Sequence, residues 1–236
     1  GLEAAWELKK AGCQVTVLEA ACQLMGRQLD DAAGEMLKHI SEQQGVQIYT
    51  GVSIASIDGE DNVTGVTLAD GRTFPAELVI VSAGVRANTV LAKTAGIEVD
   101  RAVIVNSKME TNVPDIYACG DCAQYDGLNY AIWPEASEQG KVAGANAAGE
   151  EMEYETVPAA LSFHGMRTAL FAAGDNGNPN LVYKTIELKD MGKKQYQKYY
   201  FLNNRLCGVI LIGDVSRMAE MTQALEEHVQ YQELKL

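Results

Sequence analysis

The apolar positions of the first 50 residues follow helical spacing twice, each time ahead of a strand-like run. Residues 2–9 repeat at helical spacing until Gly12, and residues 14–19 then predict a strand that closes on Glu19. A second helix is predicted from about Asp30 to Gln44, and Gly45 ends it. Its apolar face comprises Leu29, Ala33, Met36, Leu37 and Ile40.

Residues 46–81 predict strands. A short strand at 46–49 precedes two alternating runs, at 52–57 and 63–68, that flank a turn-rich segment typical of a hairpin. The continuous apolar run at 78–81 predicts a buried parallel strand.

Residues 91–149 predict a short helix at 91–95, a strand at 103–106 and a second strand that ends at 117–121. A helix opens at Trp133, because Pro134 suits a first helical position. Small residues recur every four positions along it, at Ala136, Gly140, Gly144 and Ala148. Glycine weakens a helix, so this stripe predicts a close neighbour.

The composition shifts after Gly149. Residues 150–155 are rich in glutamate and predict a solvated connector. Five strands then follow, at 160–164, 167–173, 181–188, 195–202 and 205–212, with an Asn203–Asn204 turn between the last two. A last helix is predicted from a Ser216 cap to about Gln232.

Composition restricts the class of protein. Of 236 residues, 47% are hydrophobic, which is enough for a core, and the formal net charge of −13 argues against a nucleic-acid partner. Since about 18 consecutive apolar residues would be needed to span a membrane, we expect no membrane segment. The odd number of cysteines, five, favours a reducing cytoplasm over a disulfide framework.

The start of the chain resembles the back half of a dinucleotide-binding βαβ unit: a helix, a turn, a strand and a terminal acid. Gly1 would be the last glycine of a G-x-G-x-x-G loop, and Glu19 lies at the spacing of the ribose-binding acid. A carboxylate there repels a 2′-phosphate, which favours NADH over NADPH. The alternative for Glu19 is a solvated strand end. We expect the chain to be truncated at its N-terminus.

Gly120 and Asp121 are the second candidate site. Glycine permits close backbone approach, and an aspartate accepts hydrogen bonds from the hydroxyls of a polyol. The N-terminus of the helix at Trp133 could meet an electron-rich ring edge. Packing of helix on sheet, with no ligand, is the alternative.

Residues 111–149 resemble the second FAD-binding motif of the pyridine nucleotide-disulfide oxidoreductase superfamily, in particular its rubredoxin oxidoreductase, NADH oxidase and nitrite reductase branches. The resemblance implies an α/β fold. An incomplete Rossmann-like NAD-binding domain would span 1–105, lacking its first strand and most of the glycine-rich loop. The C-terminal part of an FAD-binding domain would span 106–150, and a small α+β domain 151–236.

The resemblance also implies two cofactors, FAD and NADH. By this resemblance, Asp121 would hold the ribityl chain of FAD. The N-terminus of the helix at Trp133 would face the isoalloxazine ring, and the loop at Gly84 would lie near the nicotinamide. The predicted cofactor-binding residues are Gly1, Glu19, Gly84, Val85, Arg86, Gly120, Asp121, Trp133 and Glu135. No catalytic acid or base and no metal site is predicted.

The function that follows is an FAD-dependent oxidoreductase that passes hydride from NADH to flavin and then on to an acceptor protein or small molecule. Rubredoxin, a nitrite-reducing centre and oxygen are the candidate acceptors, and a homo-oligomer stays open. We expect this chain alone to be inactive. Two alternatives remain: a disulfide or peroxide reductase that uses a cysteine ahead of this chain, and a non-catalytic nucleotide-binding module.

Cys119 and Cys122 have the C-x-x-C spacing of a redox pair or of half a zinc site. No second pair completes a zinc site, and the two residues flank Gly120–Asp121. A structural role is therefore the preferred interpretation.

Overall fold

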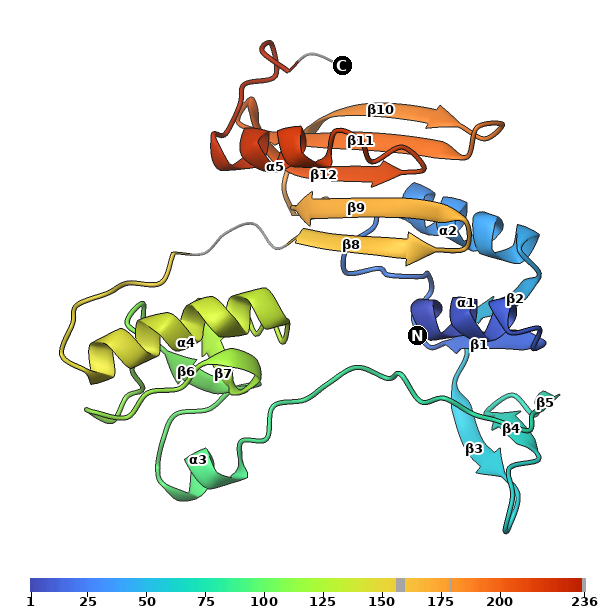
Figure 1. Ribbon diagram of the computed structural model, residues 1–236, viewed down its shortest axis with the longest axis horizontal. Coiled ribbons are helices and arrows are strands. Elements are labelled where there is room, and N and C mark those ends of the chain that lie inside the picture. Colours follow the sequence, from blue (N-terminus) through green and yellow to red (C-terminus); the bar gives the residue numbers. More distant parts are fainter. Residues whose placement is uncertain (156–159, 179, 235–236) are drawn as a thin grey trace. The chain divides into compact units, whose positions relative to one another are not determined.

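The computed structural model describes residues 1–155, 160–178 and 180–234. It divides into two compact units. The first comprises Gly1–Ser82 and the described part of Pro158–Leu236, and the second the described part of Ala83–Val157 (Figure 1). The domain boundaries at 105/106 and 150/151 stay predictions.

The first unit begins with alternating helices and strands. In order they are α1 (Leu2–Lys10), β1 (Val15–Glu19), α2 (Asp31–Gln43) and β2 (Val46–Thr50). The two strands pair in parallel, with Val15 opposite Val46 and Glu19 opposite Thr50. Both predicted helices and both strands are confirmed, and α2 begins at the predicted Asp30 cap, whose carboxylate accepts the Ala33 N–H at 2.9 Å.

A three-stranded antiparallel sheet follows, built from β3 (Ile54–Asp58), β4 (Gly65–Leu68) and β5 (Thr73–Pro75). Its first turn requires glycine. Gly59 has φ +126°, and a Cβ there would lie 2.0 Å from the carbonyl oxygen of Asn62. The predicted hairpin is confirmed.

The predicted strand at 78–81 is wrong. The segment is irregular, and Leu78 and Val81 are 63% and 71% exposed. A parallel strand needs a neighbour to satisfy its backbone, and in the described chain β1 and β2 form a sheet of only two strands. An apolar run by itself does not supply that neighbour.

The C-terminal part of the first unit is an antiparallel sheet of five strands in the order β10-β11-β12-β9-β8. The strands are β8 (Ala160–Gly165), β9 (Thr168–Gly174), β10 (Lys184–Asp190), β11 (Gln195–Leu202) and β12 (Arg205–Ile212). Asn203 and Asn204, at φ 50° and 68°, form the predicted turn between β11 and β12.

The last helix is shorter than predicted. α5 spans Met218–Glu226, its N-cap is Arg217 rather than Ser216, and it ends six residues before Gln232. His228 takes a left-handed φ of 50°, and Gln230 then bridges to Arg205 at the start of β12. Pairing with the sheet therefore replaces the last predicted helical turns.

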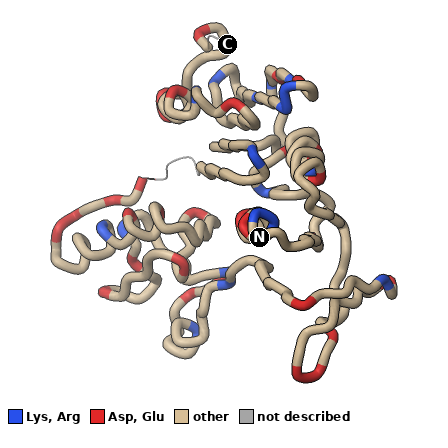
Figure 2. Tube along the Cα trace, turned by 45° about the vertical axis from the view of Figure 1, so that its right-hand side comes forward, with Lys and Arg blue, Asp and Glu red and all other residues tan. Residues whose placement is uncertain are grey.

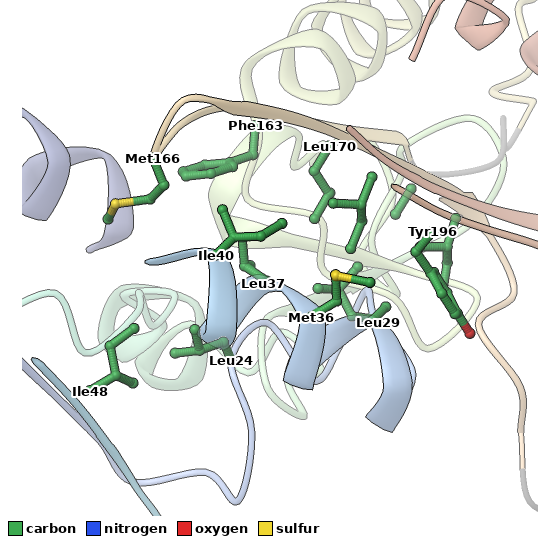
Figure 3. Packing of buried hydrophobic residues seen from close by; sticks show 14 of the residues in the cluster. Leu24, Leu29, Met36, Leu37, Ile40, Ile48, Phe163, Met166, Leu170 and Tyr196 are labelled. Atoms are coloured by element: carbon green, nitrogen blue, oxygen red, sulfur yellow. The ribbon is translucent and has the colours of Figure 1, made fainter. Parts of the chain in front are cut away.

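Both faces of this five-stranded sheet are covered. One face packs on α5 through residues such as Phe171, Tyr199 and Leu211. The other face packs on α1 and α2, and the two sets share one cluster in which Phe163, Leu170 and Tyr196 lie against Met36, Leu37 and Ile40 (Figure 3). The C-terminal sheet and the N-terminal helices thus form one continuous core.

A polar cluster lies at the edge of that core. One carboxylate oxygen of Asp30 accepts hydrogen bonds from Tyr196 Oη at 2.8 Å, Lys198 Nζ at 2.6 Å and Tyr200 Oη at 2.9 Å. Lys198 also pairs with Glu187 at 3.2 Å. Burial and the Asp30 carboxylate raise the pKa of both tyrosines, so both remain donors at neutral pH. The cap of α2 is therefore tied to β11.

Burial also acts on Asp30, where it favours the neutral acid. The hydrogen bonds from Lys198, the Ala33 N–H and the two tyrosines outweigh it and hold the pKa of Asp30 below its ordinary value. The carboxylate is therefore charged at neutral pH, as the paired Lys198 requires.

The second unit contains α3 (Val90–Thr94), β6 (Val103–Val105), the 3₁₀ turn η1 (Gly120–Cys122), β7 (Ala123–Tyr125) and α4 (Trp133–Ala147). β6 and β7 pair in parallel, with Val103 opposite Ala123. The strand predicted to end at 117–121 is wrong, because only Tyr117 forms a bridge, to Glu110, and the strand begins after the turn, at Ala123. The left-handed φ of Gly120, +72°, interrupts extended backbone at this point.

The small-residue stripe of α4 has a close neighbour at Ala136 and not at its glycines. Among the described residues, a Cβ on Gly140 or Gly144 would meet nothing within 4 Å, so the prediction fails at these two positions. The close approach occurs one turn earlier, where a Cβ on Gly120 would lie 3.3 Å from the Ala136 Cβ. Within the described ranges, no helix has both the length and the apolar character to cross a membrane.

The Asp30 cluster generates the first prediction. Asp30→Ala removes a helix cap and leaves the largely buried Lys198 with Glu187 alone, so unfolding should become easier by about 3 kcal/mol. Urea unfolding at pH 7 measures this. Asp31→Ala, which removes the exposed neighbouring acid, should cost at most about 1 kcal/mol. Equal losses for the two variants would contradict the cluster's role.

The effect should also depend on pH. The folded-state pKa of Asp30 lies below its unfolded value of about 4, so its stabilisation is present above that pH and is lost as pH falls through the folded pKa. The difference in unfolding free energy between the native chain and Asp30→Ala should therefore shrink below about pH 4. A difference that stays constant from pH 7 to pH 3 would count against a charged Asp30.

Candidate functional site

Gly1 and Glu19 lie at the same edge of the first unit. α1 and β1 run in opposite directions through a short turn at 11–14. The nine residues of α1 span about 13 Å and the five of β1 about 16 Å. Since the lengths match, the N-terminus of α1 returns to the carboxyl end of β1, the edge at which α/β sheets bind nucleotides.

Gly1 is the N-cap of α1 and makes no side-chain cap. Its carbonyl oxygen accepts the Ala5 N–H at 2.9 Å, and a Cβ on it would lie 3.6 Å from the Ser82 Cβ. The first N–H groups of the helix are thus left without a side-chain cap, as an anion site requires.

Glu19 is half-buried and is oriented by its own turn. One carboxylate oxygen, Oε1, accepts the backbone N–H of Ala21 at 2.8 Å, and the Glu19 carbonyl accepts the Val52 N–H at 3.1 Å. The second carboxylate oxygen has no hydrogen-bond partner among the described residues. That oxygen can accept a hydrogen bond from a ligand hydroxyl.

Gly84, Val85 and Arg86 belong to the second unit, in an exposed irregular segment at 83–89. Gly84 has φ +84°, which favours glycine. The segment presents backbone and apolar surface, but no described contact fixes it to a cofactor site, and its role stays a prediction.

The Gly120–Asp121 turn is held from two sides. The N–H of Gly120 donates to Gln139 Oε1 at 2.8 Å, and Gln139 on α4 is 2% exposed. Asn129 Nδ2 donates to the carbonyls of Asp121 and Ala123, at 3.0 and 2.7 Å. The Asp121 carboxylate itself is exposed, and in the described chain nothing hydrogen-bonds it. The turn is fixed while its one acid is free.

The start of α4 is close to this turn in the same unit, since Ala136 touches Gly120. Its N-cap, Ile132, supplies no side-chain cap, and Trp133 is 86% exposed. Uncapped N–H groups and an exposed aromatic ring suit an electron-rich, planar ligand.

Glu135 differs from the other predicted residues. It is 6% exposed, and its carboxylate accepts a hydrogen bond from the hydroxyl of Tyr154. Burial and this carboxylate raise the pKa of Tyr154, so the phenol remains a donor. The structure gives Glu135 a packing partner, and its cofactor contact stays a prediction.

Sequence reasoning missed Tyr154 and Gln139. The connector at 150–155 was predicted to be solvated, and its glutamates are exposed (drawn red in Figure 2), but Tyr154 is buried. Its N–H donates to the carbonyl of Ser107 at 2.7 Å, and Asn146 Nδ2 donates to Met152 at 2.7 Å. The sequence feature that could have identified Tyr154 is an aromatic residue among acidic ones. For Gln139, the feature is its i, i+4 spacing from Glu135 on the same helix.

Two family models match this chain. Residues 1–140 match the model of the pyridine nucleotide-disulphide oxidoreductase family, and residues 160–229 match that of the rubredoxin NAD+ reductase C-terminal domain. The first match includes Gly1, Glu19 and the Gly120–Asp121 turn, and the second includes the five-stranded sheet.

Individual relatives are longer than this chain. A nitrite reductase [NAD(P)H] of Bacillus subtilis is 36% identical over 217 residues, which are 92% of this chain and 27% of the relative. An NADH-rubredoxin oxidoreductase of Clostridium acetobutylicum is 29% identical over 230 residues, 96% of this chain and 55% of the relative. The chain thus spans about a quarter to a half of these curated relatives.

A solved structure has the same fold. A FAD-dependent pyridine nucleotide-disulphide oxidoreductase from Desulfovibrio vulgaris superposes with a TM-score of 0.86 at 26% identity, over 98% of this chain and 62% of the other. The α/β fold with a C-terminal domain is confirmed. Because a family model matches 140 of its 236 residues, the chain belongs to the pyridine nucleotide-disulphide oxidoreductase family.

Proposed function

We propose that the polypeptide containing this chain is an FAD-dependent NADH oxidoreductase that hands electrons to a redox protein or redox centre. The observation that carries this proposal is the anchored Gly120–Asp121 turn, whose carboxylate is free beside an uncapped helix start. The names of the relatives, which include a nitrite reductase and an NADH-rubredoxin oxidoreductase, support the same chemistry.

The residues of the second unit fit a flavin. A free carboxylate at Asp121 matches the hydroxyls of a ribityl chain, since a carboxylate accepts but does not donate. The left-handed Gly120 places backbone close to Ala136 on α4, where a Cβ would lie 3.3 Å from the Ala136 Cβ. The uncapped N–H groups behind Trp133 would stabilise negative charge on a reduced ring.

The residues of the first unit fit a dinucleotide. Gly1 brings the helix N-terminus to the edge where a pyrophosphate would sit, and Glu19 would accept from the ribose hydroxyls with its second oxygen. Gly84, Val85 and Arg86 would line the nicotinamide half. When bound, FAD supplies the hydride acceptor for NADH and the route to the next electron carrier.

The acceptor and the setting belong to the proposal too. A redox protein or redox centre is favoured because the relatives act on rubredoxin or nitrite by name. The five cysteines are free thiols, which suits a reducing cytoplasm. The assignment of 1–105 to NAD, 106–150 to FAD and 151–236 to the small domain is proposed on the same grounds.

The polypeptide that contains this chain tests the function directly. After reconstitution with FAD and removal of free flavin, NADH should bleach the visible absorbance of the bound flavin. An electron-accepting dye should restore it. Stoichiometric flavin that NADH does not bleach would contradict the oxidoreductase, and failure to retain flavin would contradict the cofactor assignment.

Asp121→Asn should weaken FAD binding. The amide keeps the size but loses the charge-assisted hydrogen bonds, which are worth about 1.5–3 kcal/mol, so the dissociation constant should rise roughly 10- to 100-fold. Quenching of flavin fluorescence measures it. Asp126→Asn is the matched control, an exposed acid just after β7, and should leave the constant unchanged. Equal FAD dissociation constants for the two variants would show that Asp121 does not bind FAD.

Glu19→Ala should weaken the binding of NADH and reduce the discrimination against NADPH. Loss of a charged acceptor for ribose hydroxyls should raise the NADH dissociation constant roughly 10-fold or more, and loss of the repulsion should bring NADPH closer to it. Titration of both nucleotides with each variant measures the ratio. Glu42→Gln, at an exposed position on α2, is the control. An unchanged ratio in Glu19→Ala would leave Glu19 as a solvated strand end.

A further inference from the structure

Cys119 and Cys122 bracket the turn that presents Asp121. Cys119 is the N-cap of η1 and Cys122 its last residue, and both are free thiols. The hydrogen bonds of Gln139 and Asn129 hold the backbone between them. The two sulfurs therefore belong to one fixed four-residue turn.

The geometry of this turn suits a disulfide. Cys119 and Cys122 stand at the two ends of a tight four-residue turn, and the Cα atoms at the ends of such a turn lie within about 7 Å of each other. Disulfides join Cα atoms separated by about 4.4–6.8 Å. Sγ of Cys122 lies 3.3 Å from the carbonyl oxygen of Cys119, so this sulfur is already beside the backbone of the other cysteine.

The described residues do not add further ligands to the pair. Among the residues that the structure describes, no group of three or more His, Cys, Asp or Glu side chains could hold a metal ion. Two thiolates alone do not complete a tetrahedral zinc site.

We propose that Cys119 and Cys122 form a reversible dithiol–disulfide pair that exchanges with low-molecular-weight disulfides. The thiolate of the exposed Cys122 attacks one sulfur of the small disulfide and releases one thiolate. The thiolate of Cys119 then attacks the Cys122 sulfur and releases the second. One S–S bond breaks and one forms, two electrons pass to the small disulfide, and its two thiolates take up the two thiol protons.

The order of attack follows from the surroundings. Cys122 is exposed, whereas Cys119 is half-buried, and burial together with the nearby Cys122 raises the pKa of Cys119. A raised pKa leaves little thiolate for attack on a molecule from solution. Held in the same turn, Cys119 still meets the Cys122 mixed disulfide at an effective concentration of mM or more.

Closing the bond would also restrict the torsions of Gly120 and Asp121. A consequence for flavin binding rests on the proposed function, whereas the bond itself does not. Its test therefore uses the flavin-free chain, and failure of one proposal leaves the other standing.

The other cysteines are internal controls. Cys13 and Cys22 are exposed but lie at opposite ends of β1, about 16 Å apart, beyond the reach of a disulfide. Cys207 donates to the carbonyl of Tyr200, and burial raises its pKa to about 11. Cys13 and Cys22 thus serve as exposed thiols that cannot pair with each other, and Cys207 serves as a thiol of low reactivity.

The experiment equilibrates the reduced chain with mixtures of reduced glutathione and glutathione disulfide, quenches with acid, alkylates and maps the peptides by mass. We expect a Cys119–Cys122 disulfide at oxidant ratios at least 10-fold lower than those that modify Cys13 or Cys22, because its second step is intramolecular. Cys119→Ser should instead accumulate a glutathione adduct on Cys122. Cys13→Ser should leave the formation of the Cys119–Cys122 disulfide unchanged.

Two results would overturn the proposal. In the first, the unmodified chain carries as much glutathione on Cys122 as Cys119→Ser does, which means that Cys119 does not resolve the adduct. In the second, Cys122 reacts no sooner than Cys13 and no internal disulfide appears. The second result is read on the unmodified chain alone, so a variant that folds poorly does not decide the outcome.

Discussion

The hydrogen bond from the Gly120 N–H to the buried Gln139 is the contact on which the candidate flavin site depends. It satisfies the side-chain oxygen of a buried residue on α4 and holds Gly120, whose torsion φ is left-handed. Asn129 holds the other end of the turn. Gln139 and Asn129 thus bind three backbone atoms of the turn, the Gly120 N–H and the carbonyls of Asp121 and Ala123, so the Asp121 carboxylate is left for a ligand. If the Asp121 carboxylate also stabilised the turn, binding a ligand would break the hydrogen bonds that hold the turn.

The dinucleotide edge depends on a different constraint, which is continuity of the core. α1 and α2 pack against the sheet of β8–β12 in a single apolar cluster, and Asp30 ties the start of α2 to β11. Gly1 and Glu19 are carried by α1 and β1, so the residues at this edge are positioned partly by a sheet that follows more than 140 residues later. The C-terminal sheet is therefore a structural support of the edge, and a truncation that removed it would expose one face of both helices.

Much of the fold followed from local patterns. The periodicity of Leu29, Ala33 and Met36 gave the buried face of α2, and the asparagine pair gave the β11–β12 turn, because each depends on neighbours in sequence. The apolar run at 78–81 failed because a parallel strand needs a partner that composition does not reveal. The helix after Ser216 ended early because pairing of Gln230 with Arg205 is a long-range contact. In the site, Asp121 and Glu19 were accessible to motif reasoning. Tyr154 and Gln139 act through buried hydrogen bonds, and an aromatic residue among acids or an i, i+4 spacing does not specify the partners of those bonds.

A crystal structure of the polypeptide that contains this chain, grown with FAD, tests the central claim most directly. We expect the Asp121 carboxylate within about 3 Å of a hydroxyl on the ribityl chain, with the Gly120–Gln139 hydrogen bond intact and the start of α4 facing the ring. A flavin bound elsewhere, with Asp121 still in solvent or turned into an ion pair, would contradict the account.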